Sequence, residues 1–580
     1  MNLVTRKELI WIFAVLALAS YAILSRIWVA EDAYISFRYT MNLLDGNGFV
    51  FNSGERVEGS TNPYWILFLS LLAFTGLPLH QTAILTGFFL SISAIVLWIR
   101  YQMKTGAYFF WGVLVLISHE GIRDFSTSGL EFSLTFFLVT LLLVSTFQTK
   151  LEKPFLIGTI VSLLYHTRPE MGLLIPLFYF FRLWESRKWE WNWIFRYGSA
   201  ILLFAISYHI FRFFYFGDIF PNTFYAKSGS ASRYIDGWNY LMHFLWYSKF
   251  FIISSISILG LIYILNRKNL INFNQTDSSI KFPFREAILA LFVGHYIVRV
   301  GGDFMAFRLL LPYFVILLFA IDSFSNQLLA KTPLIERKET IRFIFFILAF
   351  LLVFEKTNYP LVSPKGIVNE RKAYTKGYYD SYSELFTKIK YPWFETGVQF
   401  RKLQACLDIN PFIITNSVTE AKCNKSGFGL GYFSYAAGPN VSVIDELGLT
   451  DREVAKYGHK QLHGKVGHER SISLEQVIQR KVIFCSLEDE RYDQIMETPF
   501  GVMIRLDDTL LSTLGKSDFE SRMLRLASLK KEIEKSKSEK DLLLMKRLAL
   551  LEHVWNEKIE SLASRSIKES NSNKSQCWNN

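Results

Sequence analysis

The chain has 580 residues, of which 51% are hydrophobic, and the apolar residues gather in runs rather than at helical intervals. Such runs predict a membrane protein over most of the first 355 residues, so a purely soluble fold is excluded. The net charge of +12 resides in short loops and a C-terminal tail. Without a basic-aromatic motif, this charge does not indicate nucleic-acid binding.

The first apolar span, from about 8 to 28, follows Arg6 and Lys7 and has no small-residue cleavage site. This pattern predicts a retained transmembrane helix rather than a signal peptide. Ten further spans lie at about 82–99, 107–118, 130–147, 154–165, 171–182, 194–216, 249–265, 286–299, 307–322 and 341–354. A stretch at 64–77 is too short to cross. The sequence therefore predicts about eleven transmembrane helices.

Positive charge alternates between the loops. If Arg6 and Lys7 lie inside, the other basic turns also fall inside, as the positive-inside rule requires. These turns carry Arg100, Lys104, Lys150, Lys153, Arg187, Lys188, Arg267, Lys268, Lys331, Arg337 and Lys338. We therefore expect a membrane protein with a cytoplasmic N-terminus and everything after residue 355 outside.

The outer loops differ in kind, because nearly all the mixed acid-base clusters fall in them. They are 29–63, 119–131, 167–170, 217–227 and 301–308. A single cluster of this kind is most simply a solvated loop. Five clusters on one face favour a site, since ionisable groups at the ends of membrane spans often mark one.

From 356 to 515 the pattern changes to a soluble, extracytoplasmic α/β domain, with strands expected at 413–414, 441–444 and 482–484. Residues 516–580 form a charged helical segment followed by a polar tail that is expected to be disordered. Cys406 and Cys423 either form a disulfide that closes a short loop or remain as buried free thiols. None of the four cysteines has the spacing of a zinc site.

The first outer loop places two adjacent carboxylates, Glu31 and Asp32, where the first helix leaves the bilayer. A partly buried acid beside a like charge has a raised pKa, which suits it to take a proton from an attacking hydroxyl. Alternatively, the pair only caps the following helix. The surrounding sequence decides between these interpretations.

A series of ordered blocks accompanies this pair, and together they resemble the bacterial family that adds terminal β-1,2-arabinofuranose to mycobacterial cell-wall arabinan. The blocks are 31–39, 51–52, 55–59, 61–63, 129–131, 167–170, 217–227, 301–312, 366–371, 438–451 and 467–469. They cover about residues 8 to 510. The resemblance implies a GT-C fold, with the transmembrane domain at 1–355 and the catalytic loop at 29–63. It also implies transfer of a sugar from a polyprenyl-phosphate donor to an acceptor at the outer face.

Residue roles follow from this resemblance. It implies that Asp32 is the base, with Glu31 as its partner or substitute. Inversion in one displacement also needs cations on the leaving phosphate, and Arg168, Lys227 and Arg308 suit that role. Arg38 and Arg56 are second choices, or pair with Glu55 and Glu58.

The remaining candidates concern the sugar and the acceptor. Glu58, Glu131, Glu170, Asp218 and Asp303 bind sugar hydroxyls or hold the arginines by ion pairs. Asn222 and Tyr225 contact sugar or lipid phosphate. His463 lies in the outer domain, and His468, in the 467–469 block, has a structural or acceptor-binding role. No metal or other cofactor is expected to be required, although some GT-C enzymes use a metal, because Asp32, Asp218 and Asp303 lack a diagnostic spacing.

The predicted function is transfer of an arabinofuranose-like pentose to a cell-envelope glycan by an integral membrane enzyme. The chain is rich in Phe, Ile and Lys, unlike mycobacterial proteins, so another sugar stays open. Other GT-C activities, on protein or lipid A, are not discriminated. A lipid-linked glycan transporter would place charges in mid-helix and show two repeated halves, and neither appears. A non-catalytic scaffold is the third alternative.

Overall fold

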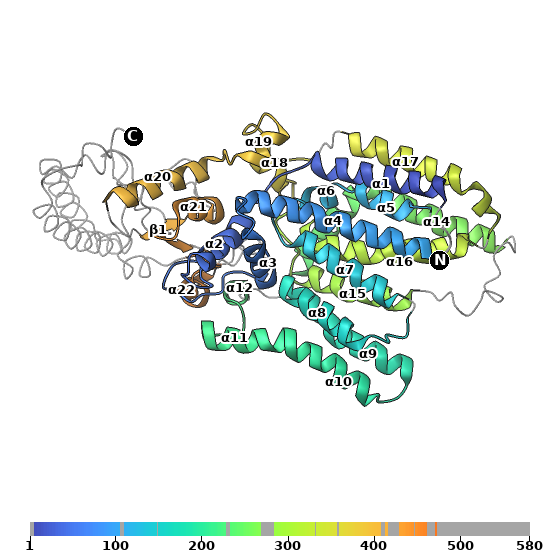
Figure 1. Ribbon diagram of the computed structural model, residues 1–580, viewed down its shortest axis with the longest axis horizontal. Helices are drawn as coiled ribbons and strands as arrows, with labels where there is room; N and C mark the ends of the chain where they lie inside the picture. Colours follow the sequence, from blue (N-terminus) through green and yellow to red (C-terminus); the bar gives the residue numbers. More distant parts are fainter. Residues whose placement is uncertain are drawn as a thin grey trace, which may run out of the picture.

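The computed structural model describes residues 5–104, 109–147, 149–227, 233–267, 283–330, 332–355, 359–407, 412–415, 429–445, 447–460 and 470–471. Over these residues the protein is an elongated bundle of helices. The first helix begins at one end of it, and short helices and strands cover the other end (Figure 1). We call the latter the outer end, because it carries the loop 29–63.

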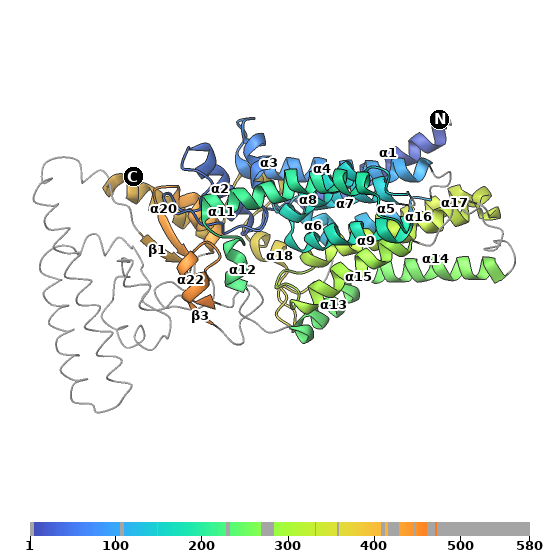
Figure 2. The ribbon, with the colours of Figure 1, turned by 90° about the horizontal axis from the view of Figure 1, so that it is seen from below.

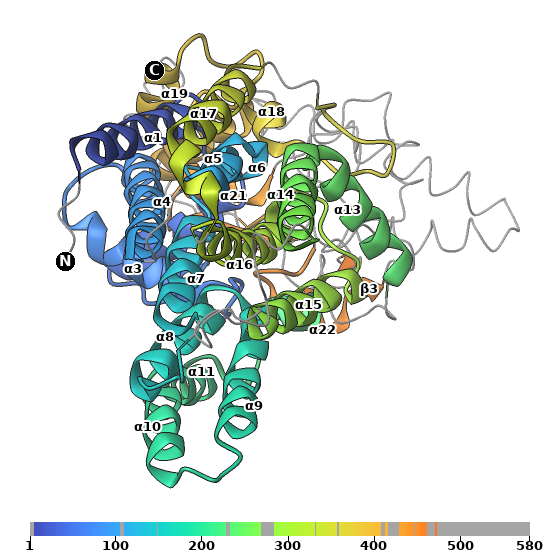
Figure 3. The same cartoon turned by 90° about the vertical axis from the view of Figure 1, so that its right-hand side faces the viewer.

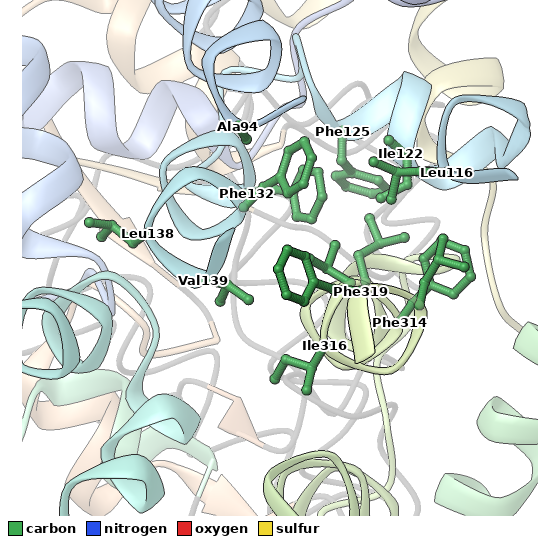
Figure 4. Packing of buried hydrophobic residues seen from close by; sticks show 14 of the residues in the cluster. Ala94, Leu116, Ile122, Phe125, Phe132, Leu138, Val139, Phe314, Ile316 and Phe319 are labelled. Carbon is green, nitrogen blue, oxygen red and sulfur yellow. The ribbon is translucent and has the colours of Figure 1, made fainter. Parts of the chain in front are cut away.

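The centre of the bundle joins helices from both halves of the transmembrane region, and α7 packs on both α4 and α16. Val139 of α7 and Phe319 of α16 point toward one another (Figure 4) and belong to the same buried apolar cluster. In lipid, close packing of this kind holds helices together. The central helices are α1 (Arg6–Leu24), α4 (Leu79–Lys104), α5 (Trp111–Ser118), α7 (Phe132–Thr146), α16 (Leu311–Leu329) and α17 (Lys338–Phe354).

A buried carboxylate ties this centre together. Asp322 accepts hydrogen bonds from Trp98 (2.7 Å), Gln102 (2.8 Å), the Gly112 main chain (3.2 Å) and Asn326 (2.8 Å). Gly112 has no Cβ, which would collide with Asp322. A buried acid needs such a set of donors, so Asp322 has a structural explanation.

Two groups of helices flank the centre. One projects sideways as a separate lobe (Figure 3) and contains α8 (Pro154–Thr167), η1 (Pro169–Leu173), α9 (Leu174–Ser186), α10 (Trp191–Ile201), η2 (Leu202–Ile206) and α11 (Ser207–Phe216). The other contains α13 (Tyr234–Tyr247), α14 (Lys249–Arg267), α15 (Phe284–Arg299) and η3 (Arg308–Leu310). The short helix η4 (Pro333–Arg337) packs on α17 of the centre.

Each of the eleven predicted spans overlaps a helix. Among the described residues, however, only four helices are long and apolar enough to cross a membrane, or five if the bent pair α13–α14 is one span. Three further apolar helices have 10–17 residues. The span Trp191–Phe216 exposes Phe195, Leu202 and Phe214, as expected for side chains that face lipid. The chain is therefore a multi-pass membrane protein, and the count of eleven stays a prediction.

The outer end is built from segments far apart in the chain, which Figures 1 and 2 show side by side. They are α2 (Ala33–Leu44), α3 (Pro63–Ala73), α6 (Glu120–Phe125), α12 (Asn222–Lys227), α18 (Glu370–Thr375), α19 (Tyr382–Thr387), α20 (Pro392–Leu407), β1 (Phe412–Thr415), α21 (Leu430–Ala437), β2 (Ser442–Asp445), α22 (Arg452–Tyr457), β3 (His459–Lys460) and β4 (Arg470–Ser471). Ile35 and Tyr39 of α2 share an apolar cluster with Leu430 and Phe433 of α21. The first outer loop therefore packs directly on α21, although about 390 residues separate the two in the chain.

Two of the three predicted strands are present. The 413–414 and 441–444 strands form β1 and β2, which pair in parallel with Ile413 opposite Val443. β3 and β4 form a second, antiparallel pair. The structure does not describe the third predicted strand or the segment 516–580. Cys423 also lies outside the described residues, so the choice between a disulfide and free thiols stays open. The α/β domain and the domain boundaries stay predictions.

Candidate active site

The two adjacent carboxylates that begin the outer loop point to different partners. Glu31 is buried, and its Oε1 accepts hydrogen bonds from the main-chain N–H groups of Gly431 and Tyr432 at the start of α21, the second at 3.2 Å. A Cβ at Gly431 would collide with the Glu31 main chain, so glycine permits this approach. Burial, followed by repulsion from Asp32, raises the pKa of Glu31 to about 8.

Asp32 keeps contact with solvent. Its side chain is 33% exposed, and its Oδ2 lies 3.3 Å from Nη1 of Arg308. Its side chain makes no capping hydrogen bond to α2, so capping does not explain this acid. Of the adjacent pair, Asp32 is therefore the carboxylate that solvent can reach.

Arg308, the partner of Asp32, is held by a strained turn. Nε of Arg308 donates to Oδ2 of Asp303 at 2.6 Å, so the guanidinium bridges two carboxylates. Gly302 adopts φ +74° with no room for a Cβ beside Tyr240, and Phe307 has φ 70°, a region that non-glycine residues rarely occupy. The turn between α15 and α16 thereby brings Arg308 to Asp32.

Two further predicted cations lie near this pair. Lys227, at the end of α12, has an exposed side chain that lies within electrostatic range of Arg308, Asp303, Asp32 and Arg168. The four charged groups around Lys227 come from three different outer loops. We call Asp32, Arg168, Lys227, Asp303 and Arg308 the charged cluster.

The side chain of Arg168 is less exposed than those of Arg308 and Lys227. It is buried and donates to Oε1 of Glu131 and Oε1 of Glu170, each at 2.6 Å. The other oxygen of Glu131 accepts from Asn62 at 2.9 Å. These two acids thus hold the arginine, one of the two roles that the sequence left open for them. Burial lowers the pKa of Arg168, but its two acids raise it by more.

A carboxyl group that sequence reasoning missed also faces the cluster. Glu370 begins α18, is 6% exposed, and lies within electrostatic range of Asp32, Glu31, Arg308 and Asp303. Burial, then repulsion from Asp32 and Glu31, raises its pKa well above the usual value. The only signal in the sequence was its place in the 366–371 block.

Arg38 corrects one expectation. It is fully buried, and its five N–H donors all point to protein acceptors, which are the carbonyl oxygens of Phe51, Ser434, Gly438 and Val441 and the side chain of Asn52. Burial lowers its pKa to about 9. A guanidinium with no donor left does not bind a phosphate, so Arg38 holds α21 on the outer loop.

Four residues that were predicted to contact a ligand make contacts within the protein. Glu58 pairs with Arg212 and accepts from Tyr208 at 2.7 Å. Asp218 pairs with Lys456 at 2.7 Å and Arg452 at 3.2 Å. The Asn222 amide donates to the carbonyl oxygens of Gly448, Leu449 and Asp451. Tyr225 has Lys456 above its ring at 4.7 Å.

These contacts stabilise the outer end, and they hold Glu58 and Asp218 in ion pairs, one of the two roles that the sequence left open for the acids. The ligand contacts of Asn222, whose Oδ1 has no partner among the described residues, and of Tyr225 stay predictions. His463 and His468 lie outside the described residues. Among the described residues, no three His, Cys, Asp or Glu side chains group so as to hold a metal ion.

Comparison with known proteins shows which family of proteins this chain is related to. A terminal β-(1→2)-arabinofuranosyltransferase of Mycobacterium tuberculosis is 30% identical over 347 residues, which are 52% of this chain and 54% of that protein. The enzyme of the same name from Corynebacterium glutamicum is 29% identical over 345 residues, or 51% and 48% of the two chains.

The chain is a distant homologue of the terminal β-1,2-arabinofuranosyltransferases. This is a GT-C family of membrane glycosyltransferases, so the resemblance inferred from the ordered blocks is confirmed. The match spans about half the length of each curated relative. No family model and no solved structure matches the chain. The homology supports a glycosyltransferase, and the charged cluster is the place to look for its chemistry.

Proposed function

We propose that this protein moves a sugar, an arabinofuranose-like pentose, from a polyprenyl-phosphate donor to a cell-envelope glycan on the outer face of the bacterial inner membrane. The distant arabinofuranosyltransferase homology supports the class of reaction. The apolar helices support the membrane setting. The N-terminus lies in the cytoplasm and the segment after residue 355 outside, in line with the distribution of basic loops.

One observation carries the chemical part of the proposal. A partly exposed carboxylate, Asp32, lies 3.3 Å from Arg308, and Lys227 is close to both. An inverting transfer needs a base for the acceptor hydroxyl and positive charge for the departing phosphate. The charged cluster supplies both at the end of the bundle where a lipid-linked donor meets water.

The reaction is a single displacement. Asp32 takes the proton of the acceptor hydroxyl as that oxygen attacks the anomeric carbon. The bond between this carbon and the phosphate oxygen breaks, and polyprenyl phosphate leaves with the electron pair. Arg308 and Lys227 stabilise the charge that develops on the leaving oxygen. No cofactor takes part in these steps.

The other acids and Arg168 act around this centre. Asp303 orients Arg308, and Glu131 and Glu170 orient Arg168. Arg168, which these acids hold through its Nε and Nη1 atoms, adds positive charge beside the site. Glu31 fixes α21 against the outer loop and thereby places Asp32.

The test is transfer of radiolabelled sugar by purified protein in lipid nanodiscs, supplied with a panel of polyprenyl-phosphate sugars and an envelope glycan acceptor. Wild type is compared with Asp32→Asn and with Asp236→Asn, whose carboxylate pairs with Arg233 on α13. We expect wild type and Asp236→Asn to form a donor-dependent product and Asp32→Asn to lose it. Equal product from all three would contradict the role of Asp32. No product from wild type would contradict the proposed transfer and favour a lipid-glycan transporter.

A further inference from the structure

Glu370 is fixed beside the charged cluster by main-chain pairing. Val368 forms a parallel bridge with Met305, in which its N–H donates to the carbonyl oxygen of Phe304 at 2.7 Å and its own carbonyl accepts from Ala306 at 2.9 Å. Residues 367–369 therefore run beside 304–306, the turn that carries Asp303 at one end and Arg308 at the other. The next residue along, Glu370, is brought to that turn.

The residues on either side of Glu370 are anchored separately. Asn369 caps α18, with its Oδ1 accepting from the N–H of Lys372 at 3.0 Å. Arg371 donates to the carbonyl oxygen of Arg26 at 3.1 Å and lies 3.8 Å from the carboxylate of Asp124. Glu370 is thus held in place by its neighbours and is not needed as an anchor.

One oxygen of the Glu370 carboxyl group lacks the partner that burial normally requires. Its Oε2 is buried and has no hydrogen-bond partner among the residues that the structure describes. Buried polar atoms are nearly always hydrogen-bonded, and an orphan calls for an explanation. Arg308, the cation within range, is already shared between Asp303 and Asp32, and the other charged groups that act on Glu370 are the carboxylates of Asp32, Glu31 and Asp303. The buried hydroxyl group of Tyr374 also lies within electrostatic range of Glu370.

We propose that Glu370 binds a hydroxyl group of the sugar substrate in the same site as Asp32. This inference rests on the proposed function. A sugar hydroxyl both donates and accepts hydrogen bonds, so it can satisfy a carboxyl surrounded by acids, where another anion would be repelled. The raised pKa of Glu370 supports this, because the neutral carboxylic acid offers one donor and one acceptor. The hydroxyl belongs to the donor sugar or to the acceptor glycan.

The experiment measures kcat and KM for each substrate in turn. Glu370→Ala removes the carboxyl, and Glu370→Gln keeps an acceptor and a donor in nearly the same shape. Glu384→Gln alters a partly buried glutamate of the same outer segment, which pairs with Lys390. Asn369→Ala weakens the cap of α18 and reports what a loosened helix alone does.

We expect Glu370→Ala to raise one of the two KM values by about tenfold, the worth of one lost hydrogen bond. Glu370→Gln should keep most of the affinity, and Glu384→Gln should match wild type. A rise confined to the donor KM assigns the hydroxyl to the donor sugar, and a rise confined to the acceptor KM assigns it to the acceptor. A deoxy analogue that lacks this hydroxyl should be used equally well by wild type and Glu370→Ala.

Two results would overturn the inference while leaving the proposed function intact. The first is a wild-type enzyme that transfers sugar, with unchanged KM values in Glu370→Ala. The second is a common loss of folded protein in Glu370→Gln and Asn369→Ala, which would assign Glu370 a structural role. If wild type transfers no sugar from any donor in the panel, the proposed function fails, and this inference fails with it.

Discussion

The guanidinium of Arg308 lies 3.3 Å from the carboxylate of Asp32, although 276 positions separate the two residues in the chain. Arg308 also holds Asp303 at 2.6 Å. An arginine with two carboxylate partners can give one up to a phosphate without being left unpaired. Donor binding at Arg308 would then release Asp32 to act as a base, which links the two halves of the proposed reaction.

The adjacent acids Asp32 and Glu31 should have different functions, Asp32 in catalysis and Glu31 in holding α21. Asp32→Asn should lower kcat by about 10²–10⁴-fold, the usual contribution of a general base, with little change in thermal stability because Asp32 is partly exposed. Glu31→Gln should keep turnover within about tenfold, because its carboxyl contacts α21. Radiolabel transfer and thermal unfolding of both variants in the same detergent check this prediction. A larger loss of turnover in Glu31→Gln than in Asp32→Asn would assign the base to Glu31.

The exposed cation should act on the donor. Lys227→Met should raise the donor KM about tenfold, as expected for the loss of one charge-assisted contact to phosphate, and should leave the acceptor KM unchanged. Lys456→Met is the matched control, because Lys456 pairs with Asp218. Both KM values are measured by product formation at saturating co-substrate. If the two lysine variants behave alike, Lys227 does not contact the donor phosphate.

Arg38 should be a stability residue. Arg38→Lys provides at most three donors for five acceptors, and each hydrogen bond lost from a charged donor is worth about 1.5–3 kcal/mol. We therefore expect a clear fall in the thermal midpoint and faster proteolysis near α21. Arg56→Lys is the control, because Arg56 is exposed and lies over the ring of Tyr215. Unchanged stability in Arg38→Lys, with a raised donor KM, would return Arg38 to the phosphate ligands.

The sequence predicted the helices well because apolar runs in a membrane protein leave few alternatives. It also located the outer loops that supply Asp32, Lys227, Asp303 and Arg308, since charges at the ends of apolar spans stand out. The roles of these charges depended on pairing across the fold. Glu58 and Asp218 were placed near the site by motif order, yet Arg212 and Lys456 occupy them.

Arg38 and Glu370 show what sequence alone does not provide. Arg38 has the chemistry of a phosphate ligand, and only the positions of five acceptors, three of them beyond residue 430, assign it to structure. Glu370 lies more than 300 residues from Asp32 in a short helix, and it reaches the site through the bridge between Val368 and Met305. Neither contact leaves a local pattern in the chain.

The stability of the outer end should depend on pH through Glu31. Its pKa is about 8 in the folded protein against an ordinary value of 4.5, so the folded state binds more protons than the unfolded chain between these two pH values. The contribution of Glu31 to the free energy of unfolding is therefore complete below about pH 4.5 and is lost as the pH rises through about 8. Glu370 and Asp445 also have raised pKa values and act in the same direction.

Glu31→Gln should weaken the dependence of stability on pH. We expect the thermal midpoint of wild type in detergent to fall from about pH 5 to about pH 8, and the midpoint of Glu31→Gln to fall less. Glu384→Gln should keep the wild-type slope, because its pKa is lowered by Lys390 and it titrates below this range. Parallel curves for wild type and Glu31→Gln would show that the Glu31 carboxyl takes up no proton on folding, and that it meets α21 as a charged group.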